Sequence, residues 1–217
     1  MPITHNTRTA DHDIDPIFLN RWSPRAFTGE PMPDDVLMSL FEAARWAPSA
    51  SNIQPWRFVY ARRGTPQWAP LFDTLMDMNQ AWVVNASVLA YAISDRFRRK
   101  PGAEPTLNRS HSFDTGAAWA CLALQAQHMG WAAHGMGGFH LAKAHEATGA
   151  PESDYRIEAG IAIGRPTDAS VLPESYRARE VPSGREPVEA FVFEGRLAAG
   201  FGKAGQMPSR LHESTSE

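Results

Sequence analysis

The sequence predicts a single domain in which strands and helices alternate, an arrangement typical of an α+β or α/β layer. Apolar, strand-like runs at residues 56–60, 87–93, 131–136 and 155–163 alternate with stretches of helical spacing. The chain of 217 residues shows no internal repeat and no linker that would divide two domains. Its length allows a sizeable core, and its composition, 43% hydrophobic and 21% charged, is ordinary for a globular protein.

The elements of the first half follow from apolar spacing and from proline. We expect a flexible N-terminus over residues 1–15 and one domain over 16–195. Within that domain the pattern predicts, in order, a helix from Pro33 that ends at Pro48, a strand at 56–60, a helix over 68–78, a central strand at 87–93 and a long loop over 94–112.

The second half begins with the clearest helix, residues 113–129. It is rich in glycine and alanine, which let another helix approach closely, so we expect it to be central and to cross a partner at a dimer interface. Ser112 and Asp114 are expected to cap its N-terminus. The remaining predictions are a strand at 131–136, a helix over 141–148, a strand at 155–163 and a polar C-terminal tail over 196–217.

Composition excludes several classes of protein. The net charge of −3 at pH 7 argues against an electrostatic binder of nucleic acid. Cys121 is the only cysteine, so neither an internal disulfide nor a CxxC metal site can form. The N-terminus lacks the apolar core of a signal peptide, and no apolar run approaches the ~18 residues of a membrane span. We therefore expect a cytoplasmic protein that binds neither membrane nor metal.

The segment around Arg21, Ser23 and Arg25 is the first candidate binding site. These side chains alternate, so in an extended backbone all three point to one face. Two guanidinium groups and a hydroxyl suit a bound phosphate or a ring carbonyl. A second candidate is the loop 48–56, which two prolines hold and which offers serine, asparagine and glutamine side chains. Together they predict a phosphorylated, ring-bearing cofactor.

Four other patterns are weaker. The glycine turn 135–139 follows a strand, but His140 stands where a Rossmann fingerprint needs glycine. Ser, His and Asp occur together within 108–114, yet no GxSxG elbow accompanies them, so a hydrolase is not expected. The histidines lack HExxH spacing, which argues against zinc. The basic cluster 177–185 is either a solvated arm or a segment that brings Ser183 and Arg185 back to the phosphate face.

Six motifs in order resemble the FMN-dependent nitroreductase family, over about residues 18–195. They are Arg21-Trp22-Ser23-Pro24-Arg25-Ala26-Phe27, Ala47-Pro48-Ser49 with Asn52-Ile53-Gln54-Pro55-Trp56, Asn79-Gln80-Ala81-Trp82, Gly135-Met136-Gly137-Gly138-Phe139, Ala162-Ile163-Gly164-Arg165-Pro166, and Pro182-Ser183-Gly184-Arg185-Glu186-Pro187. The resemblance implies an α+β fold, a central mixed or antiparallel sheet flanked by helices, and a homodimer with two FMN sites at its interface.

The resemblance also implies a role for each matching position. Arg21, Ser23 and Arg185, with Trp22 and Ser183 beside them, match the positions that hold the FMN phosphate. Arg25 matches the cation near the pyrimidine edge of the flavin, and Asn79 a side chain that hydrogen-bonds the ring or ribityl. The backbone facing flavin N5 is matched by Met136, Gly137 and Gly138. The loop supplied by the other subunit is matched by Pro48, Ser49, Ala50 and Asn52.

The activity implied is that of an FMN-dependent NAD(P)H oxidoreductase. NADH or NADPH would reduce the flavin and leave, and a nitroaromatic or quinone-like acceptor would then take the electrons, a ping-pong scheme in which no side chain need act as acid or base. Two alternatives remain open: reductive dehalogenation or ene-type reduction on the same fold, and a flavin-binding protein that does not turn over NAD(P)H.

Overall fold

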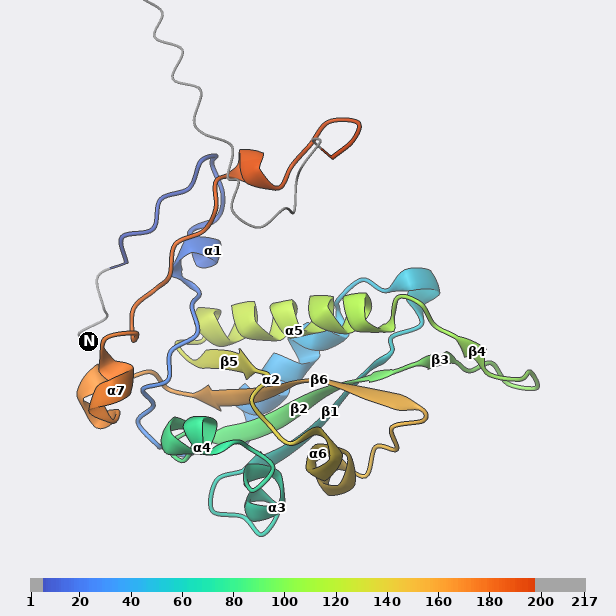
Figure 1. Cartoon of the computed structure of the whole chain (residues 1–217), viewed down its shortest axis with the longest axis horizontal. Helices are drawn as coiled ribbons and strands as arrows, with labels where there is room; N and C mark the ends of the chain where they lie inside the picture. Colours follow the sequence, from blue (N-terminus) through green and yellow to red (C-terminus); the bar gives the residue numbers. More distant parts are fainter. Residues whose placement is uncertain (1–5, 198–217) are drawn as a thin grey trace, which may run out of the picture.

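The computed structural model describes residues 6–197, and Figure 1 shows their arrangement. The helices are α1 (Pro16–Asn20), α2 (Asp34–Arg45), α3 (Trp68–Phe72), α4 (Asp77–Val83), α5 (His111–His128), α6 (Leu141–Thr148) and α7 (Glu174–Arg177), with 3-10 turns at Ala50–Asn52, Ala169–Val171 and Val188–Ala190. The strands are β1 (Trp56–Arg62), β2 (Val88–Asp95), β3 (Phe97–Arg98), β4 (Thr106–Leu107), β5 (Ala132–Met136) and β6 (Tyr155–Gly164).

The main sheet has the strand order β1-β2-β6-β5, and each neighbouring pair is antiparallel. This confirms the α+β class and settles the sheet as antiparallel rather than mixed. Strand β2 is buried along its whole length, as its apolar sequence predicted. Its residues alternate between the two faces of the sheet, because successive side chains of a strand point in opposite directions.

Helices cover both faces of the sheet (Figure 1). On one face, Val88 and Ala90 of β2 belong to the same apolar cluster as Leu37 and Leu40 of α2 and Leu122 of α5. On the other face, the alternate β2 residues join a cluster that includes side chains of α3, α4 and α6: Leu89, Tyr91, Ile93, Leu71, Trp82 and Ala144. The sheet is thus the middle layer of three, and its two faces carry separate halves of the core.

Helix α5 lies beside α2 on one face of the sheet and contacts all four strands of that sheet, so the prediction of a central helix is confirmed. The capping prediction is wrong. The helix begins at His111, and the Ser112 hydroxyl donates to Glu158 Oε1 (2.6 Å) instead of capping it. Asp114 Oδ2 accepts from Ala50 N (3.2 Å) and from the Ser110 hydroxyl (2.9 Å). Both polar groups are used in tertiary contacts that spacing does not reveal.

The single helix predicted over 68–78 is also wrong, because two short helices, α3 and α4, take its place. The chain between them pairs with the glycine turn after β5: Met76 N donates to Gly138 O (3.0 Å), and His140 N donates to Thr74 O (2.8 Å). These backbone bonds replace the helical ones, since a carbonyl or N–H paired in tertiary structure leaves the local ladder. Likewise, the predicted loop 94–112 contains the hairpin β3–β4.

The segments at the two ends of the described chain lie beside each other, away from the sheet (Figure 1). Arg8 joins them, because its guanidinium donates to the carbonyls of Ser183 (2.7 Å), Leu19 (3.1 Å) and Arg21 (2.8 Å). The predicted flexibility of residues 1–15 and most of the predicted tail 196–217 stay predictions, since 1–5 and 198–217 lie outside the described residues. Among residues 6–197, no helix is long and apolar enough to cross a membrane.

Candidate flavin site

The Arg21–Arg25 segment runs from the end of α1 to a backbone bridge between Phe27 and Pro166. An Arg21 Nη atom lies 3.4 Å from the Ser23 hydroxyl oxygen, so these two alternating side chains share a face, as predicted. Phe27, 1% exposed, anchors the segment in the core. Gly164 allows this close packing, because a Cβ there would lie 2.7 Å from the Phe27 ring. Trp22 is half-buried in the same segment.

Arg185 approaches Arg21 from the C-terminal segment. Burial lowers the pKa of Arg21, and the nearby charge of Arg185 lowers it further. Burial and the charges of Arg185 and Arg21 also lower the pKa of Arg8. None of the ion pairs formed among residues 6–197 includes any of these three arginines. Guanidinium groups without an acidic partner, beside a serine hydroxyl, have the chemistry that binds a dianion.

Arg8 was missed by the sequence prediction, because it stands alone in a polar stretch and no spacing marks it. Its N–H groups bind backbone carbonyls, so it positions the two end segments and adds charge to the cluster. Ser183 lies in this region as predicted. Its hydroxyl accepts from an Arg185 Nη atom (3.1 Å), and its carbonyl accepts from Arg8. Its neighbours Arg177 and Arg179 do not join the cluster: Arg177 binds the carbonyls of residues 170 and 172, and Arg179 lies over the Tyr176 ring.

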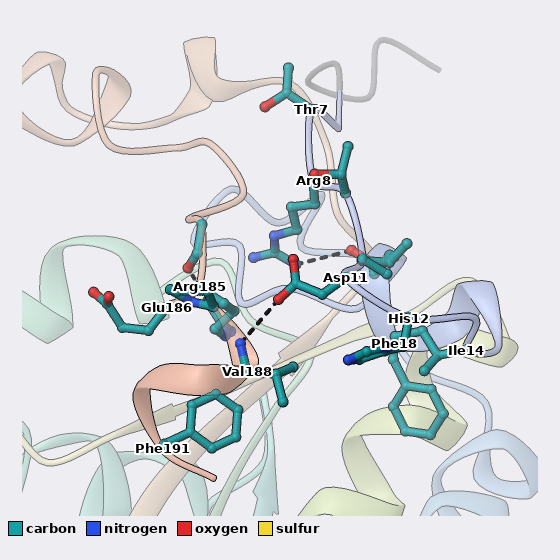
Figure 2. A pocket seen from close by; sticks show the side chains of 15 residues that line it. Thr7, Arg8, Asp11, His12, Ile14, Phe18, Arg185, Glu186, Val188 and Phe191 are labelled. Atoms are coloured by element: carbon teal, nitrogen blue, oxygen red, sulfur yellow. Dashed lines mark hydrogen bonds between the residues drawn. The ribbon is translucent and has the colours of Figure 1, made fainter. Parts of the chain in front are cut away.

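A cavity of about 770 Å³ lies on the outer side of this cluster, between the two end segments and α1. Figure 2 shows Arg8 and Arg185 on its wall with apolar side chains such as Ile14, Phe18 and Phe191. Arg25 is not among the residues that line it. The cavity therefore adjoins the phosphate side of the predicted site and does not include its ring side.

The ring side of the site is organised around Trp82 of α4. Arg25 places its guanidinium carbon 5.9 Å from the centre of the Trp82 ring. The indole N–H donates to Asn79 Oδ1 (3.2 Å), and Asn79 Nδ2 donates to Gly138 O (2.9 Å). The structure thus connects Arg25, Asn79 and the glycine turn through one tryptophan. An amide nitrogen carries two hydrogens, so Asn79 can still donate to a ligand.

The glycine turn is open on one side. A Cβ added at Gly137 would meet no atom within 4 Å, whereas one at Gly138 would lie 2.4 Å from Asn79 Nδ2. Met136, 8% exposed, packs inward beside Gly160 of β6. Gly138 is therefore required for the approach of Asn79, and Gly137 leaves room for a flat ligand to reach the backbone.

His134 of β5 is buried against the Arg21–Arg25 segment. It is 9% exposed, its ring centre lies 4.7 Å from that of Trp82, and its Nδ1 is 3.0 Å from the Pro24 carbonyl oxygen. Burial lowers the pKa of His134 to about 4, and the positive charge of Arg25 acts in the same direction against the opposing bond to Pro24. At neutral pH the imidazole is uncharged and donates its N–H to the segment.

We expect His134 to make the protein less stable as the pH falls from about 6.5 to about 4. In that range the unfolded chain binds a proton at His134 and the folded protein does not, so acid favours unfolding. The difference between pKa values of 6.5 and about 4 corresponds to about 3 kcal/mol. His134→Asn keeps a donor toward Pro24 but does not titrate. Urea unfolding at pH 7, 5 and 4 should show a smaller acid loss in this variant; equal losses would contradict the prediction.

The predicted loop 48–56 forms a second, separate group. Ser51, Asn52 and Gln54 have left-handed backbones, with φ of 52°, 54° and 54°. The Ser49 hydroxyl accepts from Gln54 N (3.1 Å), and the buried carboxylate of Asp114 accepts from Ala50 N (3.2 Å). Strained non-glycine residues persist only where contacts hold them, and they concentrate at binding sites. Pro48, Ala50 and Asn52 are exposed at the surface of this rigid loop.

The structure keeps the two groups apart. The loop 48–56 contacts the N-terminal end of α5, whereas α1 and the arginine cluster lie toward its C-terminal end (Figure 1). Helix α5 has 18 residues, so it separates them by about 27 Å. One chain therefore does not bring the loop to its own arginine cluster.

A serine–histidine–acid cluster does form, but from residues the sequence did not predict together. Ser94 lies 2.7 Å from His111 Nδ1 and donates its hydroxyl hydrogen to Glu158 Oε1 (2.6 Å). His111 Nδ1 must therefore carry the hydrogen that Ser94 accepts. A hydrolytic relay needs the serine and the acid at opposite ring nitrogens, and here both face Nδ1. The cluster is structural, and among residues 6–197 no group of acidic, histidine or cysteine side chains could hold a metal ion.

Comparison with known proteins agrees with the fold and the motifs. The model of the nitroreductase family matches residues 19–67, a range that contains both the arginine segment and the loop. The protein DrgA of Synechocystis is 32% identical over 175 residues, which cover 67% of this chain and 80% of that protein. A crystal structure described as an oxidoreductase containing FMN is 48% identical, covers 89% of this chain and 97% of its own, and superposes with a TM-score of 0.86.

Another relative matches only locally. A putative NADH dehydrogenase/NAD(P)H nitroreductase of Rhodopseudomonas palustris is 36% identical over 52 residues, 24% of this chain and 26% of that protein. The match to DrgA, by contrast, extends over most of both chains. The fold is that of an α+β protein with an antiparallel sheet between two layers of helices, and its arginine cluster stands outside the sheet, between the two end segments. The chain belongs to the nitroreductase family, as its motifs predicted.

Proposed function

We propose that the chain is an FMN-dependent NAD(P)H oxidoreductase that reduces nitroaromatic or quinone-like acceptors in a ping-pong scheme. The observation that carries the proposal is the uncompensated pair Arg21 and Arg185 beside Ser23. Arg25, in the same segment, lies over Trp82, whose indole N–H binds Asn79 next to the open glycine turn. The FMN in the 48% identical crystal structure and the NAD(P)H nitroreductase name of a relative support it. A cytoplasmic location belongs to the same proposal.

The residues present fit the phosphate of FMN. Burial lowers the pKa of Arg21, and repulsion by the charge of Arg185 lowers it further; a dianion between the two cations would replace this repulsion with two attractions. Ser23 would add a hydroxyl, and Ser183 and Trp22 would complete the surroundings. Two cations held close together without an acidic partner destabilise the protein. Such an arrangement is typical of a site where a bound ligand supplies the opposite charge.

The ring side fits equally well. Bound FMN would supply two-electron hydride chemistry that no side chain provides. Arg25 would stabilise negative charge at the pyrimidine edge, and Asn79 would donate from its second amide hydrogen. The open space at Gly137 would admit nicotinamide and acceptor in turn to the same side.

The functional unit we propose is a homodimer. The loop residues Pro48, Ala50 and Asn52 are exposed, Ser49 is half-buried, and all four are remote from the arginine cluster of their own chain, so each loop would complete the flavin site of the other subunit. Exposed apolar side chains on both end segments, such as Phe18 (54%) and Phe191 (61%), offer further surface for such an interface.

Anaerobic mixing with NADH or NADPH tests the proposal. We expect the purified yellow protein to bleach rapidly with one or both nicotinamides and to recover its colour when a quinone or a nitroaromatic compound is added. Fast bleaching in the absence of acceptor is the mark of a ping-pong scheme, because the donor half-reaction then proceeds alone. A colourless protein that gains no flavin from added FMN would refute the proposal. A yellow protein that does not bleach would refute the oxidoreductase activity and would indicate a protein that only binds flavin.

A further inference from the structure

A buried glutamate touches the proposed flavin site from a distant part of the sequence. Glu180 follows α7, is 3% exposed and lies 155 residues from Arg25 in the chain. Its Oε1 accepts the backbone N–H of Arg25 (2.6 Å) and of Ala26 (2.8 Å). Its Oε2 has no hydrogen-bond partner among the described residues and lies 3.9 Å from an Arg25 Nη atom.

The two backbone bonds of Glu180 do not require a charged side chain. Two N–H bonds to one oxygen could equally be accepted by the amide oxygen of a glutamine. Burying a carboxylate instead costs several kcal/mol unless its charge is compensated, and here a single guanidinium faces the second oxygen. The excess cost indicates that the charge itself acts on Arg25.

Arg25 is held between two groups. The Glu180 carboxylate faces its guanidinium from one direction, and the Trp82 ring lies 5.9 Å from the guanidinium carbon. The Arg25 side chain remains 26% exposed, so it can reach a ligand while it is oriented from within the protein. Both the position of this cation and the net charge of the pair that it forms therefore depend on Glu180.

We propose that Glu180 is a positioning residue of the flavin site, which aims Arg25 at the ring and partly offsets its charge. The proposal rests on the proposed function, because it takes Arg25 to face the flavin. It predicts that Glu180 lowers the preference of the site for reduced flavin, since a carboxylate close to a cation weakens its hold on the negative charge that reduction leaves on the ring.

The test compares Glu180→Gln with Glu180→Ala and with the control Glu174→Gln, an exposed glutamate in the first turn of α7. Reduction potentials of the bound flavin and FMN dissociation constants are measured, together with hydrogen exchange of the Arg25 and Ala26 amides in the FMN-free protein. For Glu180→Gln we expect unchanged amide protection and a preference for reduced over oxidised flavin about tenfold greater than in wild type, a positive shift of about 30 mV for a two-electron couple.

Glu180→Ala should lose both the amide protection and most of the FMN affinity, and Glu174→Gln should match wild type. A potential unmoved in Glu180→Gln, with FMN bound by the wild type, would overturn this inference alone. Loss of amide protection in Glu180→Gln equal to that in Glu180→Ala would also overturn it, because the role would then be structural. A wild-type protein that binds no FMN would overturn the proposed function and this inference together.

Discussion

Replacing Arg21 and Arg185 together by alanine is expected to leave a folded protein that no longer retains FMN. Each arginine would lose a charge-assisted bond to the phosphate worth roughly 1.5–3 kcal/mol. The two losses together weaken FMN binding by roughly a hundredfold to ten-thousandfold. Fluorescence titration of the FMN-free variant measures the change directly, and desalting should yield a colourless protein.

The fold should survive this double substitution. Arg185 is exposed, and its removal takes a like charge away from Arg21, whose pKa it lowers. The unfolding midpoint of the FMN-free variant should therefore stay near that of wild type. Arg179→Ala is a matched control, because Arg179 lies in the same C-terminal segment but over the Tyr176 ring. Retention of FMN by the double variant at wild-type affinity would refute the phosphate assignment.

Mixing two inactive variants is expected to restore activity if loop and arginine cluster of one site come from different chains. The first variant carries Arg21→Ala and Arg185→Ala. The second carries Ser49→Ala, which removes the acceptor of the Gln54 N–H, and Asn52→Val, which puts a β-branched residue at a φ of 54°. In a mixed dimer, one site has both halves altered and the other has both halves intact.

The size of the recovery is set by symmetry. Random exchange of subunits makes about half of the dimers mixed, each with one intact site of two, so NADH-dependent turnover should reach about one quarter of the wild-type value. Each variant alone should be nearly inactive, as should a mixture assembled without subunit exchange. No recovery after complete exchange, shown by mass spectrometry of the dimers, would contradict the shared site.

The local chemistry of the site could be predicted from the sequence because its signals are short-range. The alternation of Arg21 and Ser23 predicts that they share a face, and their 3.4 Å contact confirms this; that Arg25 shares the same face stays a prediction. Helix α6 matches its predicted bounds, residues 141–148, since glycine and proline stop it and its own spacing forms it. Strands β2 and β6 were located to within two residues for the same kind of reason.

The sequence mispredicts the secondary structure at positions where hydrogen bonds to distant residues override the local preference. The break between α3 and α4 is made by backbone bonds from residues 74 and 76 to the glycine turn about 60 residues later. Asp114 and Ser112 have the spacing of caps, yet their oxygens serve the loop 48–56 and Glu158. Capping is a local preference worth about 1 kcal/mol, so a buried partner elsewhere can displace it.

The sequence by itself predicted the family and located the arginine segment, the loop 48–56 and the glycine turn, because each of these motifs consists of residues that are neighbours in the chain. Only the tertiary structure decided which residues contact them. Glu180 binds the backbone of Arg25, and His134 lies against the Pro24 carbonyl. Trp82 contacts both Arg25 and Asn79, and Arg8 joins the two end segments. It also decided that the loop and the arginine cluster lie at opposite ends of α5. Apart from the Asn79–Trp82 bond, these contacts join residues that are not neighbours in the chain, and only the folding of the whole chain brings them together.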